Sequence, residues 1–72
     1  MNIQKVMKAM ADSNRREILC LLKKQNLSAG DIASNFDISM AAISRHLSVL
    51  QEAKLVESKR DGKNIIYSLN IS

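Results

Sequence analysis

The chain has no proline, one cysteine, one histidine and only two glycines among its 72 residues. A single cysteine excludes an intrachain disulfide framework, and one cysteine with one histidine falls short of the three or four ligands of a protein zinc site. No apolar stretch approaches the roughly 20 residues that cross a bilayer, and the first residues do not form a signal peptide. These absences predict a reduced, cytoplasmic domain without a cofactor.

The composition is that of an ordinary globular domain, with 46% hydrophobic and 25% charged residues. A chain this short builds one compact unit, so we expect a single domain over residues 1–72. The net charge of +4 is uneven: residues 1–24 carry +4, residues 25–53 carry −2 and residues 54–72 carry +2. A basic balance favours polyanionic partners, but it is also common in domains that bind none.

Apolar residues at helical spacing predict two helices in the first third of the chain. The first helix carries one apolar stripe made of Ile3, Val6, Met7 and Met10. The capping residues Asp12, Ser13 and Asn14 then indicate the start of a second helix, which runs to about Lys24 and buries Ile18, Leu19, Leu21 and Leu22.

Two further helices are predicted at residues 28–36 and 39–53, separated by about three residues. Ser28 and Ser39 are their expected caps, and the inward-facing residues are Ile32, Ala33, Phe36, Ile43, Leu47, Leu50 and Ala53. Two helices joined by so short a connection are typical of a helix-turn-helix, in which the second helix enters the major groove of DNA. An ordinary helical hairpin is the structural alternative.

From Leu55 onward the hydrophobic period changes from 3.6 to 2 residues. Val56, Ser58 and Arg60 alternate with Glu57 and Lys59, and Asp61-Gly62 is a strong two-residue turn signal. The return strand contains Ile65, Ile66, Tyr67 and Leu69, residues that suit a strand. The sequence therefore predicts a mainly α domain, with three or four helices closed by a β-hairpin.

Several motifs, in order and at matching spacing, resemble the ArsR family of winged-helix repressors. They are Asp12-Ser13-Asn14-Arg15-Arg16-Glu17-Ile18-Leu19, Leu27-Ser28-Ala29-Gly30-Asp31-Ile32-Ala33 and Ile43-Ser44-Arg45-His46-Leu47-Ser48-Val49-Leu50. The stretch from Leu55 through Asp61-Gly62 to Leu69 is similar to the family's wing. The resemblance implies a winged helix-turn-helix regulator, a repressor that binds a pseudo-palindromic operator as a homodimer.

The sequence departs from the family pattern in three places. Ser13 and Asn14 stand where Pro-Thr is usual, and Asp37 stands in the turn where many helix-turn-helix proteins have glycine. Asp tolerates the left-handed conformation better than most residues do. The family usually continues into a C-terminal dimerisation helix that these 72 residues do not include. Either that helix lies outside these residues, or dimerisation uses a reduced surface; the stripe Ile3, Val6, Met7 and Met10 is the expected dimer interface.

The resemblance also implies which side chains contact DNA. The recognition helix presents Met40, Ala41, Ala42, Ser44, Arg45 and Ser48, of which only Arg45 has the charge and reach for a bidentate contact to guanine. The wing contributes Lys59, Arg60, Lys63 and Asn64, and Arg15 is a further candidate phosphate contact. Arg16 is a candidate ion-pair partner of Glu17 or Asp12, and His46 is expected to be packed or hydrogen-bonded.

The metal-sensing and enzymatic alternatives have little support in the sequence. Many members of the family bind metal through two thiolates, but Ser28 and Gly30 occupy those positions here, and the closer likeness is to metal-independent members of the SdpR type. There is no glycine-rich phosphate loop and no pair of catalytic residues that the spacing brings together. Cys20, with Arg16, Glu17, Lys23 and Lys24 at helical spacing, is a candidate redox-active thiol or an inert exposed one. The remaining alternative is a winged-helix module that binds protein instead of DNA.

Overall fold

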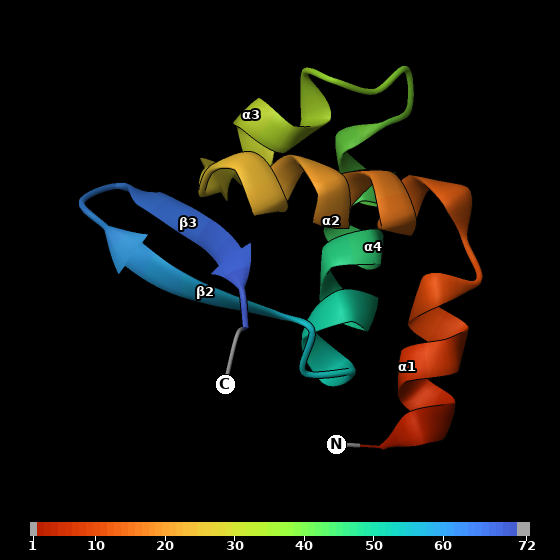
Figure 1. Cartoon of the computed structure of the whole chain (residues 1–72). Coiled ribbons are helices and arrows are strands. Elements are labelled where there is room, and N and C mark those ends of the chain that lie inside the picture. The colour runs from red at the N-terminus through yellow and green to blue at the C-terminus, as the bar shows by residue number, and fades with distance from the viewer. Residues whose placement is uncertain (1, 71–72) are drawn as a thin grey trace.

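The structure, a computed structural model, describes residues 2–70. The elements follow one another as α1 (Ile3–Met10), α2 (Ser13–Lys24), β1 (Leu27–Ser28), α3 (Ala29–Ala33), α4 (Met40–Glu52), β2 (Val56–Asp61) and β3 (Asn64–Leu69). The three strands form an antiparallel sheet in the order β1-β3-β2, and the β2–β3 hairpin projects from the helical body (Figure 1). The fold is a winged helix-turn-helix, as the sequence predicts.

A polar side chain caps the N-terminus of each helix within residues 2–70. The Asp12 carboxylate accepts the backbone N–H groups of Asn14 and Arg15, and the hydroxyls of Ser28 and Ser39 each accept one N–H from the following turn. These contacts satisfy donors that have no partner inside the helix. They confirm the caps predicted for the second, third and fourth helices, while Asn2 caps α1.

The core lies where α4 contacts α1, α2, α3 and β2. The predicted apolar positions of α4 are nearly fully buried, and the complete buried set is Ala9, Ile18, Leu22, Ile32, Ile43, Leu47, Leu50, Ala53 and Val56. In α1 only Ala9 is buried, whereas Ile3 and Met7 remain 69% and 66% exposed. Of the apolar stripe of the first helix, Val6 packs against the core, while Ile3, Met7 and Met10 stay exposed on one protomer.

The connection between α3 and α4 is longer than the sequence predicts. α3 ends at Ala33 rather than near residue 36, because the N–H groups of Asn35 and Phe36 bond to carbonyls only three residues back. These tighter bonds continue the chain as a turn instead of an α-helix. Asp37, which stands where many helix-turn-helix proteins have glycine, does not use the left-handed conformation that Asp tolerates: within residues 2–70 only Lys54 and Gly62 have positive φ.

Lys54 ends α4 in the left-handed conformation, with φ at 64°. Its N–H bonds to the Gln51 carbonyl at 3.0 Å, and the N–H of Leu55 bonds to the Leu50 carbonyl at 3.1 Å. This pair of bonds is the Schellman motif, which usually places glycine at the left-handed position. The motif reverses the chain direction and leads it into β2.

The sheet contains one strand that the periodicity did not predict. β1 is only two residues long, with Leu27 opposite Tyr67 and Ser28 opposite Ile66 of β3. Two residues are too few to show an alternating pattern, so only the pairing with β3 identifies them as a strand. Ser28 serves twice, because its backbone pairs with β3 while its hydroxyl caps α3.

Candidate nucleic-acid interface

One face of α4 is exposed and made of small or flexible side chains. Met40, Ala41, Ser44, Arg45 and Ser48 are exposed, while Ala42 is half-buried beside the Ser39 cap. Positions 41, 44, 45 and 48 follow the helical repeat and therefore share one face. Arg45 is the only Lys or Arg in α4, so this face presents one strong hydrogen-bond donor among small neighbours. That is the arrangement a helix needs to enter the major groove.

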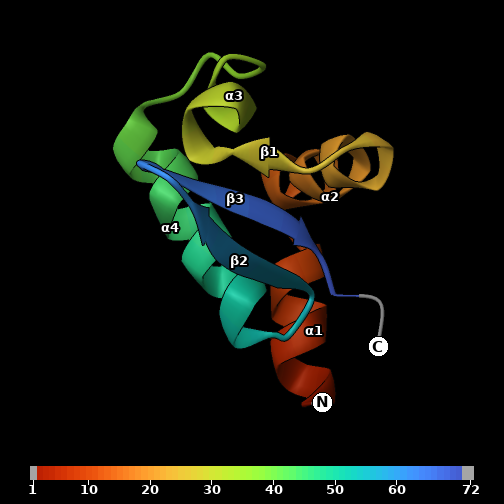
Figure 2. The same cartoon turned by 90° about the vertical axis from the view of Figure 1, so that its left-hand side faces the viewer.

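The hairpin lies beside this face. Figure 2 shows α4 and the hairpin tip on one side of the molecule, with α2 on the other. The side chain of Gln51 on α4 donates to the Ser58 hydroxyl on β2 at 3.1 Å. This contact ties the wing to the recognition helix, and the sequence pattern did not indicate it. Its two partners are seven residues apart in different elements, so only the tertiary structure brings them together.

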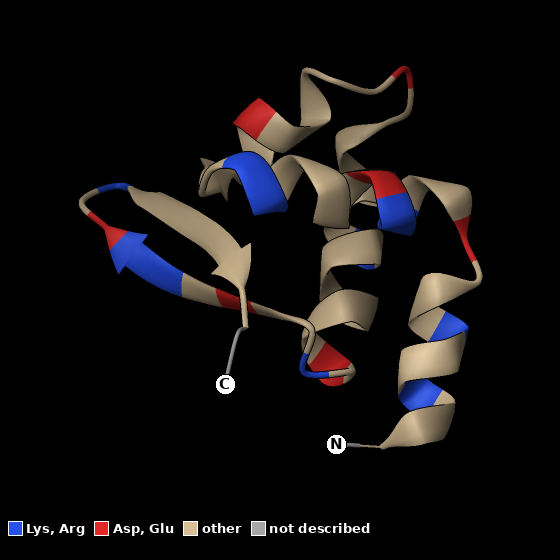
Figure 3. Ribbon diagram, viewed as in Figure 1, with Lys and Arg blue, Asp and Glu red and all other residues tan. Residues whose placement is uncertain are grey.

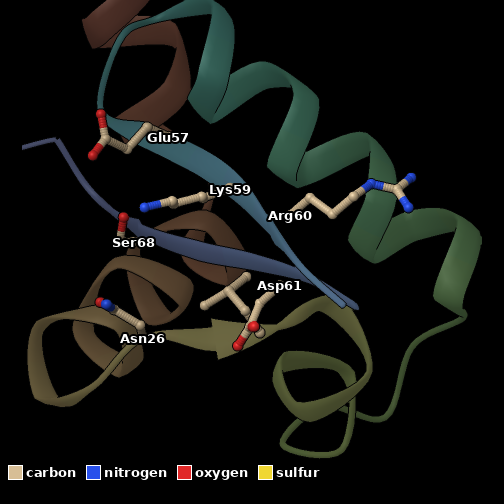
Figure 4. A pocket seen from close by; sticks show the side chains of 7 residues that line it. Asn26, Glu57, Lys59, Arg60, Asp61 and Ser68 are labelled. Atoms are coloured by element: carbon tan, nitrogen blue, oxygen red, sulfur yellow. The ribbon is translucent and has the colours of Figure 1, made fainter. Parts of the chain in front are cut away.

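The register of the hairpin separates the predicted wing residues into two sets. Val56 is buried against the helices and Ser58 bonds to α4, so Arg60, two residues further along β2, lies on the same face. Lys59 lies on the opposite face, in a hollow of about 330 Å³ that Glu57, Asp61 and four other residues border. Arg60 also borders this hollow, but Figure 4 shows its side chain extending in the opposite direction from that of Lys59, toward α4. Arg60, and not Lys59, therefore faces the side of the molecule that carries the recognition helix.

The hairpin turn is shifted by one residue from the predicted position. Asp61 pairs with Asn64, so the turn consists of Gly62 and Lys63 instead of Asp61-Gly62. Gly62 has φ at +64° at the first turn position, which is the requirement of a type II′ turn. Lys63 is therefore the residue at the tip of the wing, and Asn64 is held in the strand.

Charge is distributed unevenly over the molecule (Figure 3). Basic side chains occur along α1, at both ends of α2 and along the hairpin, whereas α3 and the turn after it carry Asp31 and Asp37. The recognition helix itself has little positive charge. Electrostatic attraction to a polyanion must therefore come mainly from the elements that surround α4.

The arginine pair at the start of α2 is engaged within the protein. Arg15 donates from Nε to the Ala9 carbonyl at 2.9 Å and from Nη2 to the Lys8 carbonyl at 3.1 Å. Arg16 donates from Nη1 to the Met10 carbonyl at 2.7 Å. Both guanidinium groups thus donate to carbonyls in the last turn of α1, where the Lys8 carbonyl also accepts the backbone N–H of the C-cap residue Ala11.

The third contact of Arg15 reaches the recognition helix. Its Nη1 lies 3.3 Å from Nδ1 of His46, and since guanidinium cannot accept, the arginine donates and the imidazole accepts. His46 is half-buried, which confirms that it is a packed and hydrogen-bonded residue. Arg15 is likewise partly buried, so these contacts give it a role inside the protein, and its contact with phosphate stays a prediction.

The cap of α2 lies next to this arginine. The pKa of Asp12 is lowered from its usual value of 3.8, mainly because the Arg15 backbone N–H donates to the carboxylate. Desolvation opposes this effect, while the Asn14 N–H and the charge of Arg15 add to it. The carboxylate is therefore the preferred form of this cap in the folded state.

Cys20 is a free, exposed thiol, as predicted. It borders an apolar hollow of about 510 Å³, formed chiefly by Met10, Leu19, Leu55 and Leu69, rather than a purely polar face. Its redox activity stays a prediction. Within residues 2–70 no group of three His, Cys, Asp or Glu residues could hold a metal ion, and no helix there is long and apolar enough to cross a membrane.

These elements together define a winged helix-turn-helix protein, with α3 and α4 as the helix pair and β2–β3 as the wing. The family model for bacterial regulatory proteins of the arsR family matches residues 12–58. The chain belongs to the ArsR family. This membership identifies it as a DNA-binding transcriptional regulator and not an enzyme.

Characterised relatives include both repressors and an activator. The transcriptional repressor SdpR of Bacillus subtilis is 49% identical over 65 residues, which are 90% of this chain and 72% of SdpR. The transcriptional activator HlyU of Vibrio cholerae is 35% identical over 65 residues, which are 90% of this chain and 60% of HlyU. The relatives thus extend beyond the part that matches.

Solved structures confirm the fold. HlyU from Vibrio cholerae superposes with a TM-score of 0.88 at 33% identity, covering 97% of this chain and 76% of that one. A homodimeric winged helix-turn-helix DNA-binding domain from Mycobacterium bovis, a possible ArsR-family regulator, gives a TM-score of 0.89 at 29% identity. That match covers 94% of this chain and 63% of the other.

Proposed function

We propose that this protein is a cytoplasmic repressor that binds a pseudo-palindromic operator as a homodimer. The observation that carries the proposal is the exposed face of α4, on which Arg45 is the single basic side chain among small neighbours. Arg45 donates to guanine in the major groove, and Ser44 and Ser48 bond to neighbouring bases or phosphates. Met40, Ala41 and Ala42 supply apolar contacts such as those made with thymine methyl groups.

The wing supplies electrostatic affinity and no base readout in this proposal. Lys63 at the hairpin tip and Arg60 on the α4 side contact phosphate or the adjacent minor groove. Lys59, on the other face of the hairpin, makes no direct contact with the duplex that α4 occupies. Asn64 is a neighbouring polar contact at the tip.

The homodimer rests on α1. Ile3, Met7 and Met10 are three of the five large apolar side chains that are exposed within residues 2–70, and Val6 lies half-buried on the same helix. Burying this stripe against a second copy removes apolar surface from water. Successive major grooves on one side of DNA lie about 34 Å apart, and this spacing is comparable to the largest dimension of a protomer that measures 32 × 28 × 20 Å, so each of two adjacent copies can reach one groove. Repression then follows from occupancy of the promoter.

The proposal is tested by selecting duplexes from a random library with the wild-type protein. Fluorescence anisotropy then measures the affinity for the selected duplex and for a scrambled duplex of equal length, at several salt concentrations. We expect Arg45→Ala to reduce the ratio of the two affinities roughly 5- to 150-fold for each half-site, the range for loss of one bidentate base contact, and by the square of that factor for a dimer that loses both. Lys63→Ala is the control, because a phosphate contact should weaken binding to both duplexes alike.

Two results would contradict the proposal. If no sequence is enriched and the wild-type protein binds the library only at low salt, the domain does not read DNA sequence. If Arg45→Ala and Lys63→Ala lower both affinities equally, Arg45 does not contact bases. A complete lack of DNA binding would instead favour the protein-binding module.

A further inference from the structure

A single side chain joins three helices at the centre of this molecule. The guanidinium of Arg15, in the first turn of α2, donates to the carbonyls of Lys8 and Ala9 at the end of α1. On its other side it donates to the ring of His46 on α4, at 3.3 Å. Arginine is suited to this task, because its planar group carries five donors in a fixed geometry.

The backbone of Arg15 is fixed as well. Its N–H donates to the Asp12 carboxylate at 3.2 Å, within the cap of α2. The residue is therefore held at the main chain by the cap and at the side chain by acceptors on two other helices. The Arg15 side chain therefore has little freedom to change rotamer. Because one guanidinium bonds to both α1 and His46, a shift of α1 relative to α2 would also disturb the contact with His46.

The position of His46 determines that of Arg45, because the two are adjacent in one rigid helix. Inside the protein, α4 is packed through Ile43, Leu47 and Leu50, whose apolar contacts are not directional, and the Gln51–Ser58 hydrogen bond fixes its C-terminal end against the wing. The hydrogen bond to His46 is directional and resists rotation of α4 about its axis. A rotation moves the Arg45 guanidinium, at the end of a long side chain, away from a base edge.

We propose that Arg15 is a positioning residue for DNA readout, which acts through His46 to hold α4 at the rotation that presents Arg45. The same guanidinium ends α1, so the placement of α1 is coupled to the orientation of the recognition helix. The inference rests on the proposed function, since it concerns how Arg45 reads bases. It extends that function by assigning a specificity role to two residues that do not face DNA.

Arg16 provides a matched control. It is the next residue in the chain and also donates to the end of α1, from Nη1 to the Met10 carbonyl at 2.7 Å. None of the hydrogen bonds found for its side chain leads to α4. Arg15→Lys and Arg16→Lys both keep the positive charge and both lose the forked donor group. Only Arg15→Lys breaks the simultaneous contact with α1 and His46.

The experiment measures the ratio of affinities for the selected and the scrambled duplex. All variants are measured at one salt concentration and at a temperature well below their thermal unfolding midpoints. We expect Arg15→Lys to reduce this ratio roughly 3- to 30-fold, a change typical of partners in one hydrogen-bond network. Arg16→Lys should leave the ratio within about twofold of wild type. Because the ratio compares two duplexes of equal charge, a loss of general electrostatic attraction does not change it.

The histidine provides an independent pair of variants. His46→Leu removes the acceptor and should lower the ratio, whereas His46→Gln retains an acceptor and should restore at least part of it. The double variant Arg15→Lys/His46→Leu should lose no more discrimination than the greater single loss. These variants keep the proposal testable if Arg15→Lys does not fold.

Three results would overturn the inference. Equal ratios for Arg15→Lys and Arg16→Lys would show that the contact with α4 is irrelevant to readout. Equal ratios for His46→Leu and His46→Gln, or losses that simply add in the double variant, would do the same. A wild-type protein that does not discriminate between the duplexes would refute the proposed function itself, and the inference with it.

Discussion

The two faces of the hairpin lead to a quantitative prediction for a pair of adjacent residues. Arg60→Ala and Lys59→Ala each remove one positive charge from an exposed position on β2. Arg60 is opposite Ile65 and Lys59 is opposite Ile66, so their side chains leave the sheet in opposite directions. Only Arg60 points toward the side of α4 (Figure 4).

The expected magnitude follows from counterion release. Each phosphate that a protein neutralises contributes about −0.9 to the slope of log K against log salt concentration. A homodimer has two wings, so Arg60→Ala should make the slope shallower by about 1.8. Between 50 and 200 mM salt, the affinity deficit of this variant should therefore shrink roughly tenfold. Lys59→Ala should keep a slope near that of wild type.

The assay is a salt series of anisotropy titrations with the selected duplex, for wild type and both variants. Both substitutions change the net charge equally, so the general attraction of the protein to DNA is matched. A larger change of slope for Lys59→Ala than for Arg60→Ala would refute the assignment of faces. Equal changes would show that the wing acts only through its total charge.

Three further predictions concern stability and assembly. The folded-state pKa of Asp12 is lowered, so its carboxylate stabilises the fold at pH values above the pKa of this group in the unfolded chain, and this stabilisation is lost as pH falls through the folded-state pKa. The thermal unfolding midpoint of the wild-type protein should therefore fall more steeply below about pH 4 than that of Asp12→Asn. Parallel curves of midpoint against pH would contradict this. Lys54→Gly should raise the unfolding free energy in urea by about 0.5–1 kcal/mol, because glycine adopts the left-handed conformation without the steric penalty; a decrease would show that the Lys54 side chain contributes more than the backbone. Met7→Asp should convert a dimer to a monomer in sedimentation equilibrium while leaving the fold intact, since Met7 is 66% exposed; a dimer that persists would place the interface elsewhere.

The sequence by itself determined where the second, third and fourth helices begin, which residues cap them, and which of them is the recognition helix. Ser39 and the repeat of Ile43, Leu47 and Leu50 are local signals, and the structure has the cap and the three buried side chains where the pattern predicts them. Each depends on residues within one or two turns of helix, and such residues contact one another whatever the rest of the chain does. The same reasoning found the hairpin to within one residue of its turn.

Only the tertiary structure decided how these elements act on one another. The strand β1 exists because Leu27 meets Tyr67, 40 positions along the chain. No sequence pattern indicated that the guanidinium of Arg15 bonds to the end of α1 and to His46, 31 residues away. The face on which Arg60 lies depends on how β2 packs against α4. Periodicity within a segment carries no information on such contacts, because they depend on which distant groups share one site after the chain has folded.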